Sequence, residues 1–296
     1  MGYKSGFVTI IGRPNVGKST LTNDILGEKI AIMSNKPQTT RNKIHAIYNT
    51  DDAQIIFIDT PGIHKPKNKL GEYMVTAATE TLNEVDVVVF MVDESKEIGP
   101  GDKYILESLR DVKTPVILVI NKIDLLSPDD YKNLFDQYSE YDFLDYVMGI
   151  SAVKNTNVEA LLGKIVERLP EGPMLYPDDM ITDQPERVIV SEIIREKILH
   201  YIDDEIPHGV AVEIERMKKR NGKDMIDISA TIICEKKSHK GIIIGKNGRK
   251  LKGIGKTSRE DIERLLGSRV FLELYVKVRE GWRDNENMLK GFGYRR

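Results

Sequence analysis

Hydrophobic residues in the first half of the chain form short, continuous apolar runs that are separated by amphipathic stretches. Each run has the length and the β-branched content of a buried strand. The runs cover Phe7–Ile11, Ile55–Ile58, Val87–Val92, Val116–Ile120 and Tyr146–Ile150. The amphipathic stretches have helical periodicity and cover Leu21–Leu26, Leu70–Leu82, Lys103–Arg110 and residues 158–165. Strands that alternate with helices predict an α/β domain with a mostly parallel sheet.

The pattern changes after residue 169, because residues 170–177 contain three prolines and a glycine, which is typical of a linker. The following stretches indicate, in order, a helix, two alternating strands with a turn between them, two helices and a last strand. They cover residues 190–202, 210–215, 226–232, 241–244, 251–266 and 270–278. This order predicts an α+β domain with an antiparallel-type sheet under helices. We therefore expect a first domain at 1–170, a linker at 171–183 and a second domain at 184–296.

Charge is distributed unevenly between the two expected domains. The net charge is −2 over 296 residues, but residues 1–180 carry 19 Lys and Arg against 27 Asp and Glu. Residues 181–296 carry 25 against 19, so the two parts have net charges of −8 and +6. The basic second part favours contact with a polyanion, although a difference in solvated surface accounts for the counts equally well.

Apolar run lengths and cysteine content indicate a cytoplasmic location. No run approaches the ~18 residues that span a bilayer, and the N-terminus has no signal-peptide pattern. The single cysteine, Cys234, excludes a disulfide within the chain. We expect the chain to work in a reducing cytoplasm.

A glycine-rich loop between a strand and a helix is the first candidate site. It reads Gly12-Arg13-Pro14-Asn15-Val16-Gly17-Lys18-Ser19-Thr20, which has the spacing and the context of a phosphate-binding loop. Its glycines let backbone N–H groups face phosphates, and the helix N-terminus adds positive potential. We expect Lys18 to lie between the β and γ phosphates and the Ser19 hydroxyl to ligate Mg²⁺.

A second motif, Asp59-Thr60-Pro61-Gly62, follows the strand at Ile55–Ile58. Alone, it indicates only a turn that uses proline and glycine for backbone geometry. Its position after the phosphate loop favours a nucleotide-binding role. We expect Asp59 to orient a Mg²⁺-bound water, and the Gly62 N–H to sense the γ-phosphate.

The third and fourth motifs predict which base is bound. In Asn121-Lys122-Ile123-Asp124, the Asp124 carboxylate can accept from the ring imino group and the exocyclic amine of guanine, a pair that adenine does not offer. The Lys122 stem can cover the ring face. In Ser151-Ala152-Val153-Lys154, the Ala152 N–H can meet the guanine carbonyl. These motifs predict GTP and GDP as ligands.

The four motifs together resemble the translation-factor-related class of small GTPases, over residues 7 to about 168. The resemblance implies that Pro37-Gln38-Thr39-Thr40-Arg41 is the first switch, in which Thr40 closes onto Mg²⁺ and the γ-phosphate. Thr39 competes with Thr40 for this role. A polar loop without that function is the alternative.

The residue after Gly62 is Ile63, whereas Ras-like enzymes have a water-orienting glutamine at this point. Isoleucine cannot orient water, so we expect slow intrinsic hydrolysis. This matches the group of GTPases with a hydrophobic residue here. The resemblance to members of that group implies that Asn15 helps to hold a charge-neutralising K⁺, although hydrogen bonding within the loop explains Asn15 as well.

The second domain contains a Gly-x-x-Gly turn in a strongly basic segment. From Glu235 to Arg259 there are nine Lys and Arg residues and one acid. The turn and the order of elements resemble a type II KH domain, which clamps single-stranded nucleic acid. We expect the apolar segment Ile242–Ile244 to contact bases and Trp282 to be a packing residue. The expected RNA-binding residues are Ile244, Gly245, Lys246, Asn247, Gly248, Arg249, Lys250 and Lys252.

A GTPase domain joined by a short linker to a KH domain is similar to the Era family of bacterial ribosome-assembly GTPases, over essentially the whole chain. The resemblance implies binding near the 3′ end of small-subunit ribosomal RNA, assembly of the small ribosomal subunit, peripheral association with the inner face of the membrane, and a monomer. Two alternatives stay open. One is an RNA-binding module that does not hydrolyse its nucleotide, and the other is a membrane-surface signalling GTPase whose basic segment meets anionic lipid.

Overall fold

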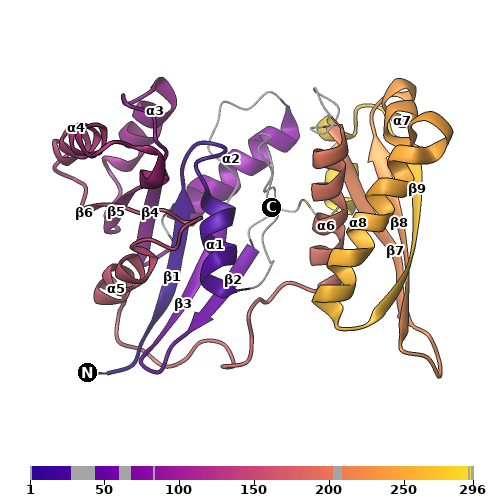
Figure 1. Ribbon diagram of the computed structural model, residues 1–296, viewed down its shortest axis with the longest axis horizontal. Helices are drawn as coiled ribbons and strands as arrows, with labels where there is room; N and C mark the ends of the chain where they lie inside the picture. Colours follow the sequence, from indigo (N-terminus) through magenta and orange to yellow (C-terminus); the bar gives the residue numbers. More distant parts are fainter. Residues whose placement is uncertain are drawn as a thin grey trace. The chain divides into compact units, whose positions relative to one another are not determined.

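The computed structural model describes residues 2–27, 44–59, 68–82, 84–202, 209–292 and 294, without the side chains of Ile44, Asp59 and residues 77–80. It divides into two compact units, which meet in sequence at Asp183 and Gln184. The fold class is confirmed: a mostly parallel α/β unit is followed by an α+β unit (Figure 1). The expected domain boundaries at 170 and 184 stay predictions.

The first unit is built on a six-stranded sheet in the order β2-β3-β1-β4-β5-β6. Its strands are β1 (Lys4–Ile11), β2 (Ile44–Asn49), β3 (Ala53–Asp59), β4 (Val87–Val92), β5 (Val116–Ile120) and β6 (Tyr146–Gly149). All neighbours pair in parallel except β2 and β3, which are antiparallel. The five strands expected from the apolar runs are therefore confirmed, and β2 is an additional edge strand.

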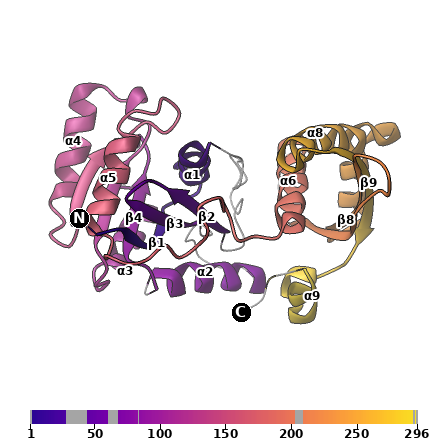
Figure 2. The same ribbon diagram turned by 90° about the horizontal axis from the view of Figure 1, so that it is seen from below.

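Helices cover both faces of this sheet, and each face has its own hydrophobic core. The helices are α1 (Lys18–Leu26), α2 (Lys69–Leu82), α3 (Pro100–Leu109), α4 (Pro128–Ser139) and α5 (Val158–Arg168). One core joins the sheet to α1 and α5, and the other joins it to α2, α3 and α4. Figure 2 shows α1 and α2 on opposite sides of the strands. Every residue of β4 and β5 is buried, which explains their uninterrupted apolar sequences.

Two elements of the first unit have weak sequence signals. In β2, the neighbours Ala46 and Ile47 point to opposite faces and both are buried, so the strand lacks inside-outside alternation. In α4, only Leu134 and Tyr138 are buried. The start of α4 is set instead by Ser127, whose hydroxyl accepts from the Asp130 N–H, and by a proline in the first turn.

The second unit has a three-stranded sheet with helices on one face. Its elements are α6 (Glu186–Tyr201), β7 (Ala211–Lys219), β8 (Met225–Cys234), α7 (Lys237–Ile244), α8 (Arg249–Leu266), β9 (Arg269–Val278) and α9 (Glu286–Gly291). The sheet order is β7-β8-β9. β7 and β8 are antiparallel, but β8 and β9 are parallel, so the expectation of an antiparallel-type sheet is wrong for this pair. The reason is that α7 and α8 form the crossover between β8 and β9, as a parallel pair requires.

The core of the second unit lies between α6, α7, α8 and the sheet. Cys234 is fully buried in it. Trp282 is also fully buried, and its indole N–H donates to the Gly209 carbonyl at 3.0 Å. The expectation that Trp282 is a packing residue is confirmed.

Residues 171–183 are held against the edge of the first unit's sheet. The Thr182 hydroxyl donates to the His45 carbonyl at 2.7 Å, and the Ile47 N–H donates to the Ile181 carbonyl at 2.9 Å. Gln54 of β3 is fully buried and makes three hydrogen bonds to this segment. Its Oε1 accepts from the backbone N–H groups of Leu175 and Tyr176 at 2.7 and 2.9 Å, and its Nε2 donates to the Tyr176 carbonyl at 2.8 Å. The segment is therefore attached to the edge strand β2 and to the start of β3.

Replacing Gln54 with alanine is expected to lower the free energy of unfolding by about 1–3 kcal/mol, because it removes the partner of two backbone N–H groups. Denaturant titration measures the loss, and faster protease cleavage within residues 173–183 shows where it acts. Gln137→Ala is the matched control, since that amide makes one 3.4 Å bond at the surface. Equal protease resistance of Gln54→Ala and the native chain would contradict this account of the attachment.

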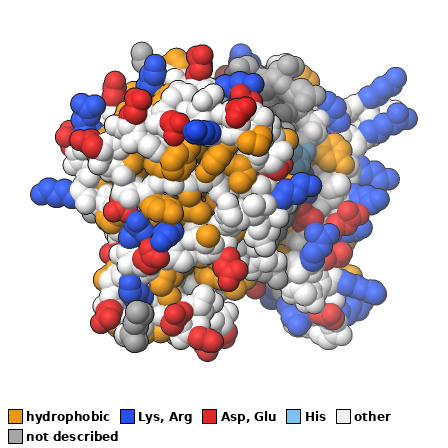
Figure 3. Space-filling model, turned by 60° about the vertical axis from the view of Figure 1, so that its left-hand side comes forward, with side chains coloured by type: hydrophobic (Ala, Val, Ile, Leu, Met, Phe, Trp, Pro, Cys, Tyr) orange, Lys and Arg blue, Asp and Glu red, His pale blue; other side chains and the backbone are white. Residues whose placement is uncertain are grey.

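Both signs of charge occur on the face drawn in Figure 3, where Lys and Arg side chains gather along the right-hand edge. Within the described ranges, no helix is both long enough and apolar enough to cross a bilayer.

Candidate nucleotide site and nucleic-acid groove

The loop between β1 and α1 has a backbone shape that requires its glycines. Gly12 and Gly17 have φ of 151° and 109°. A Cβ on Gly12 would lie 2.2 Å from the Met91 carbonyl oxygen, and one on Gly17 would lie 2.2 Å from the Asn121 Nδ2. Asn15 has φ of 70°, a left-handed conformation that asparagine tolerates. The loop is thus fixed close to the ends of β4 and β5, directly before the N-terminus of α1.

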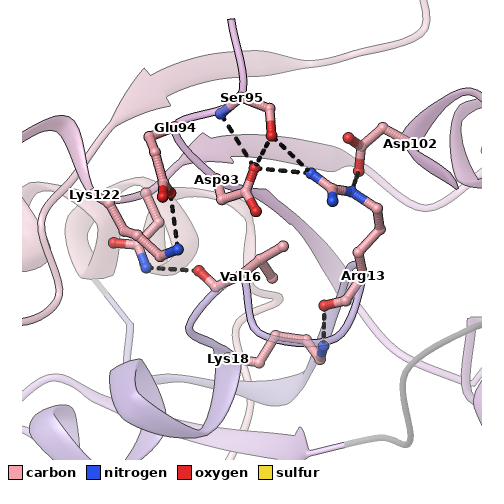
Figure 4. Close-up of polar contacts among 9 residues, drawn as sticks. Arg13, Val16, Lys18, Asp93, Glu94, Ser95, Asp102 and Lys122 are labelled. Carbon is pink, nitrogen blue, oxygen red and sulfur yellow. Dashed lines mark hydrogen bonds and ion pairs between the residues drawn. The ribbon is translucent and has the colours of Figure 1, made fainter. Parts of the chain in front are cut away.

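Lys18, the first residue of α1, is the most buried cation of this loop, with 8% of its surface exposed. Its Nζ donates to the Gly12 carbonyl oxygen at 3.0 Å and to the Arg13 carbonyl oxygen at 2.8 Å, the second of which is drawn in Figure 4. The ammonium group is therefore inside the curve of the loop, where phosphate oxygens can take the place of these carbonyls. Ser19 and Thr20 follow in the first turn of the helix.

The Arg13 side chain anchors the loop to α3, a role that the sequence does not indicate. Its Nε donates to Asp102 and its Nη2 to Asp93, both at 2.8 Å (Figure 4). A Cβ on Gly101 would lie 2.7 Å from the Arg13 Cδ, so this glycine lets α3 approach the arginine.

The two carboxylates that bind Arg13 are affected in opposite directions. Burial raises the pKa of Asp102, and its hydrogen bond with Arg13 only partly offsets this. Burial also acts to raise the pKa of Asp93, but the Ser95 hydroxyl and the Arg13 charge outweigh it, so that this pKa lies below its ordinary value. The same two acids keep the pKa of Arg13 above that of a free guanidinium, against the effect of burial. Arg13 therefore stays charged and paired.

Asn121 connects three separate parts of the site. It is almost fully buried, its Nδ2 donates to the Val16 carbonyl at 2.8 Å, and its Oδ1 accepts from the Ala152 N–H at 3.0 Å. The phosphate loop, the end of β5 and the loop after β6 are thereby held together. Ser151 is buried beside it, and its hydroxyl accepts from the Lys154 N–H at 3.2 Å.

The residues expected to meet the base lie at the rim of this arrangement. Lys122 has φ of 63°, and its Nζ makes an ion pair with Glu94 at 2.8 Å (Figure 4). Asp124 is exposed in a short 3₁₀ turn over Ile123–Leu125. Its carboxylate is therefore accessible to a ligand.

Part of the expected site falls outside the described residues. Pro37–Arg41 with Thr39 and Thr40, and the residues Thr60, Pro61, Gly62 and Ile63, belong to this part. The backbone of Asp59 is described at the end of β3, where it pairs in register with Ile10 of β1. Asp59 is therefore at the same sheet edge as the phosphate loop, as expected from its position after the strand.

In the second unit, the Gly-x-x-Gly turn joins α7 to α8. Gly245, Asn247 and Gly248 have φ of 71°, 54° and 73°. A Cβ on Gly245 would lie 2.9 Å from the Lys250 Cγ, whereas a Cβ on Gly248 would have no described atom within 4 Å. Close packing against Lys250 therefore explains why residue 245 is glycine. At Gly248, by contrast, the backbone is accessible at the start of α8.

A groove of about 760 Å³ begins at this turn and runs between α8 and β9. Of the expected RNA-binding residues, Gly248, Arg249 and Lys252 line it. Seven further residues line it, namely Leu251, Gly253, Gly255, Lys256 and Arg259 on α8 and Leu272 and Leu274 on β9. Lys256 and Arg259 belong to the basic segment of the sequence, and the two leucines of β9 belong to the strand expected at 270–278.

The expected base contact at Ile242–Ile244 stays a prediction, and the three side chains differ in exposure. These residues form the end of α7, so they point in different directions: Ile243 is fully buried and Ile242 is 41% exposed. The leucines that line the groove are Leu251 of α8 and Leu272 and Leu274 of β9.

Known proteins match both units and the whole chain. A family model described as a 50S ribosome-binding GTPase matches residues 7–122, and one described as a KH domain matches residues 205–283. The GTPase Era of Alkaliphilus oremlandii is 66% identical over 294 residues, with 99% of this chain and all of that protein covered. The GTPase Era of Clostridioides difficile is 62% identical over 295 residues, with 99% of both chains covered.

Solved structures agree with these relatives. A crystal structure of Era in complex with MgGDPNP and nucleotides 1506–1542 of 16S ribosomal RNA has a TM-score of 0.94 and 42% identity, covering 99% of both chains. A variant of Aquifex aeolicus Era bound to GDP and AlF4⁻ has the same TM-score and identity, covering 98% of this chain and 99% of that one.

Proposed function

Because the chain belongs to the Era family of GTPases, we propose that GTP binding and hydrolysis by its first unit control RNA binding by its second unit. The proposed RNA is small-subunit ribosomal RNA, bound near its 3′ end. The process served is assembly of the small ribosomal subunit. One observation carries the RNA part of the proposal: Gly248 of the Gly-x-x-Gly turn and four basic side chains of α8 line one groove.

On the nucleotide side, the proposal assigns the phosphates to the loop Gly12–Thr20. Backbone N–H groups and the N-terminus of α1 favour the anion, and Lys18 exchanges its two carbonyl partners for phosphate oxygens. The residues fit a Mg²⁺–nucleotide complex, since Ser19, which carries a hydroxyl group, follows Lys18 in the first turn of α1. Ser19 and Thr40 would ligate Mg²⁺, with Asp59 holding a coordinated water, and the ion would neutralise charge that develops between the β and γ phosphates.

Guanine is assigned to the rim of the site. The Asp124 carboxylate accepts from the two N–H groups of the base, and the Lys122 stem lies over the ring. The guanine carbonyl is assigned to the Ala152 N–H, which would then be shared with the Asn121 Oδ1, its partner at 3.0 Å. Asn121 itself joins the phosphate loop to the loop after β6 and is not assigned a contact with the base.

K⁺ is expected to accelerate GTP turnover at least about tenfold over Na⁺ at equal ionic strength, because a cation contact worth ~1.4 kcal/mol in the transition state changes the rate by that factor. Asn15 would supply the side-chain oxygen. Asn15→Gly keeps the left-handed backbone and removes that oxygen, so it should abolish the difference between the two salts. Phosphate release assays in both salts measure this, and equal turnover of the native chain in K⁺ and Na⁺ would end the K⁺ hypothesis.

The proposal extends to a monomer in the cytoplasm that associates peripherally with the inner face of the membrane. A lipid-binding GTPase is the competing function, since a basic groove also attracts anionic headgroups. Anisotropy titration of the full chain with labelled RNA of the sequence 1506–1542, and flotation with phosphatidylserine vesicles, distinguish the two. Tight RNA binding that a scrambled RNA does not reproduce supports the proposal, whereas vesicle binding without RNA preference favours the competitor.

A further inference from the structure

Helix α8 contains two glycines, Gly253 and Gly255, in its first half. Glycine in a helix interior lowers helix stability relative to alanine, because the unfolded chain has more conformational freedom. A glycine inside a helix is therefore explained either by close packing within the domain or by a ligand that contacts the helix backbone.

Gly253 has a packing reason. A Cβ at this position would lie 2.7 Å from the Cε1 and 3.1 Å from the Cζ of Tyr201, which ends α6. A side chain here would push the aromatic ring away from α8.

Gly255 has no such reason among the described residues. Its φ is not positive, and the nearest atom to an added Cβ would be the Leu274 Cδ1 at 3.5 Å, an ordinary van der Waals contact. An alanine therefore fits the fold at position 255. What the added methyl would change is the groove, because both Gly255 and Leu274 line it.

We infer that Gly255 is a base-contact position: it leaves the backbone of α8 open so that one nucleobase of the bound RNA lies flat against it, with Leu274 beside the same base. The surroundings fit this use. Lys252, Lys256 and Arg259 also line the groove, spaced by one helical turn, so they can follow a backbone while bases turn inward. A methyl group added at position 255 would occupy part of the groove beside Leu274 and would hold a base away from the helix backbone.

The inference rests on the proposed RNA binding, and its test is Gly255→Ala in the full chain. The variant is expected to raise the melting temperature and to weaken binding of labelled RNA 1506–1542 about tenfold. Gly163→Ala is the matched control, because Gly163 lies inside α5 with no described atom within 4 Å of an added Cβ. The control should gain similar stability and bind RNA like the native chain. Unchanged RNA affinity of Gly255→Ala would overturn the inference.

A second measurement separates a base contact from a general narrowing of the groove. Single abasic nucleotides are placed in turn along the RNA and titrated against the native chain and Gly255→Ala. One position should weaken binding to the native chain but not to the variant, since the variant has already lost that contact. Additive losses at every position would contradict a base contact. If the native chain itself binds no RNA, the proposed function fails together with the inference, whereas tight native binding with an unaffected variant removes the inference alone.

Discussion

The Asp124→Asn variant is expected to bind GTP about 100- to 10,000-fold more weakly than the native chain and to gain affinity for xanthosine triphosphate. The carboxylate accepts two hydrogen bonds from guanine, and each hydrogen bond to a charged group is worth ~1.5–3 kcal/mol. An asparagine amide presents a donor where the exocyclic amine of guanine also donates. Xanthine carries a carbonyl oxygen there, which accepts from the amide.

Competition titration with fluorescent GTP measures both affinities. Asp129→Asn is the matched control, because Asp129 is exposed, lies only five residues further along the chain and makes the same change in charge. It should leave both affinities within twofold of the native values. Unchanged preference of Asp124→Asn for GTP over xanthosine triphosphate would contradict the assignment of the base.

The Gly248→Asp variant is expected to lose about 10- to 100-fold in RNA affinity while it binds GTP normally. Gly248 begins α8 with φ of 73°, and no described atom lies within 4 Å of an added Cβ, so the domain accommodates the side chain. The new carboxylate would repel the phosphate that approaches this helix N-terminus, and its bulk would hold the RNA backbone away.

Gly248→Asn separates these two effects. Asparagine tolerates the left-handed backbone as well as aspartate does and has nearly the same volume, but it carries no charge. Loss of RNA affinity in both variants would identify close backbone approach as the dominant effect, and loss in Gly248→Asp alone would identify charge. Native RNA affinity of Gly248→Asp would remove the turn from the RNA-binding site.

The elements that sequence predicts best are those whose burial is simplest. β4 and β5 are buried along their whole length, so each apolar run in the sequence begins and ends where the strand does. β2 cannot be recognised from the sequence because Ala46 and Ile47 are both buried, so apolar and polar residues do not alternate along it. Residues 171–183 cover one edge of β2. Their attachment through Gln54 joins residues far apart in the chain, so no local sequence pattern predicts it. β8 and β9 alternate as any strands do, and only their connection through two helices reveals that they are parallel.

The candidate sites divide in the same way. Each nucleotide motif follows a buried strand, and the sheet brings those strand ends to one edge. The contacts that shape the site are not visible in sequence, because Arg13 and Asp102 lie 89 residues apart and Asn121 and Ala152 lie 31 apart. In the second unit, the Gly-x-x-Gly turn is found from its glycines. The groove wall on β9 is not, since Leu272 and Leu274 have the alternation of core residues.

The most direct test of a GTP switch that controls RNA binding is the affinity of the full chain for labelled RNA 1506–1542, measured by anisotropy with saturating MgGDPNP and again with saturating MgGDP. The account predicts that RNA binds at least about tenfold more tightly in the GDPNP state, which corresponds to a coupling free energy of ~1.4 kcal/mol between the two ligands. By reciprocity, the RNA must then tighten GDPNP binding by the same factor. Equal RNA affinity in the two nucleotide states would contradict it.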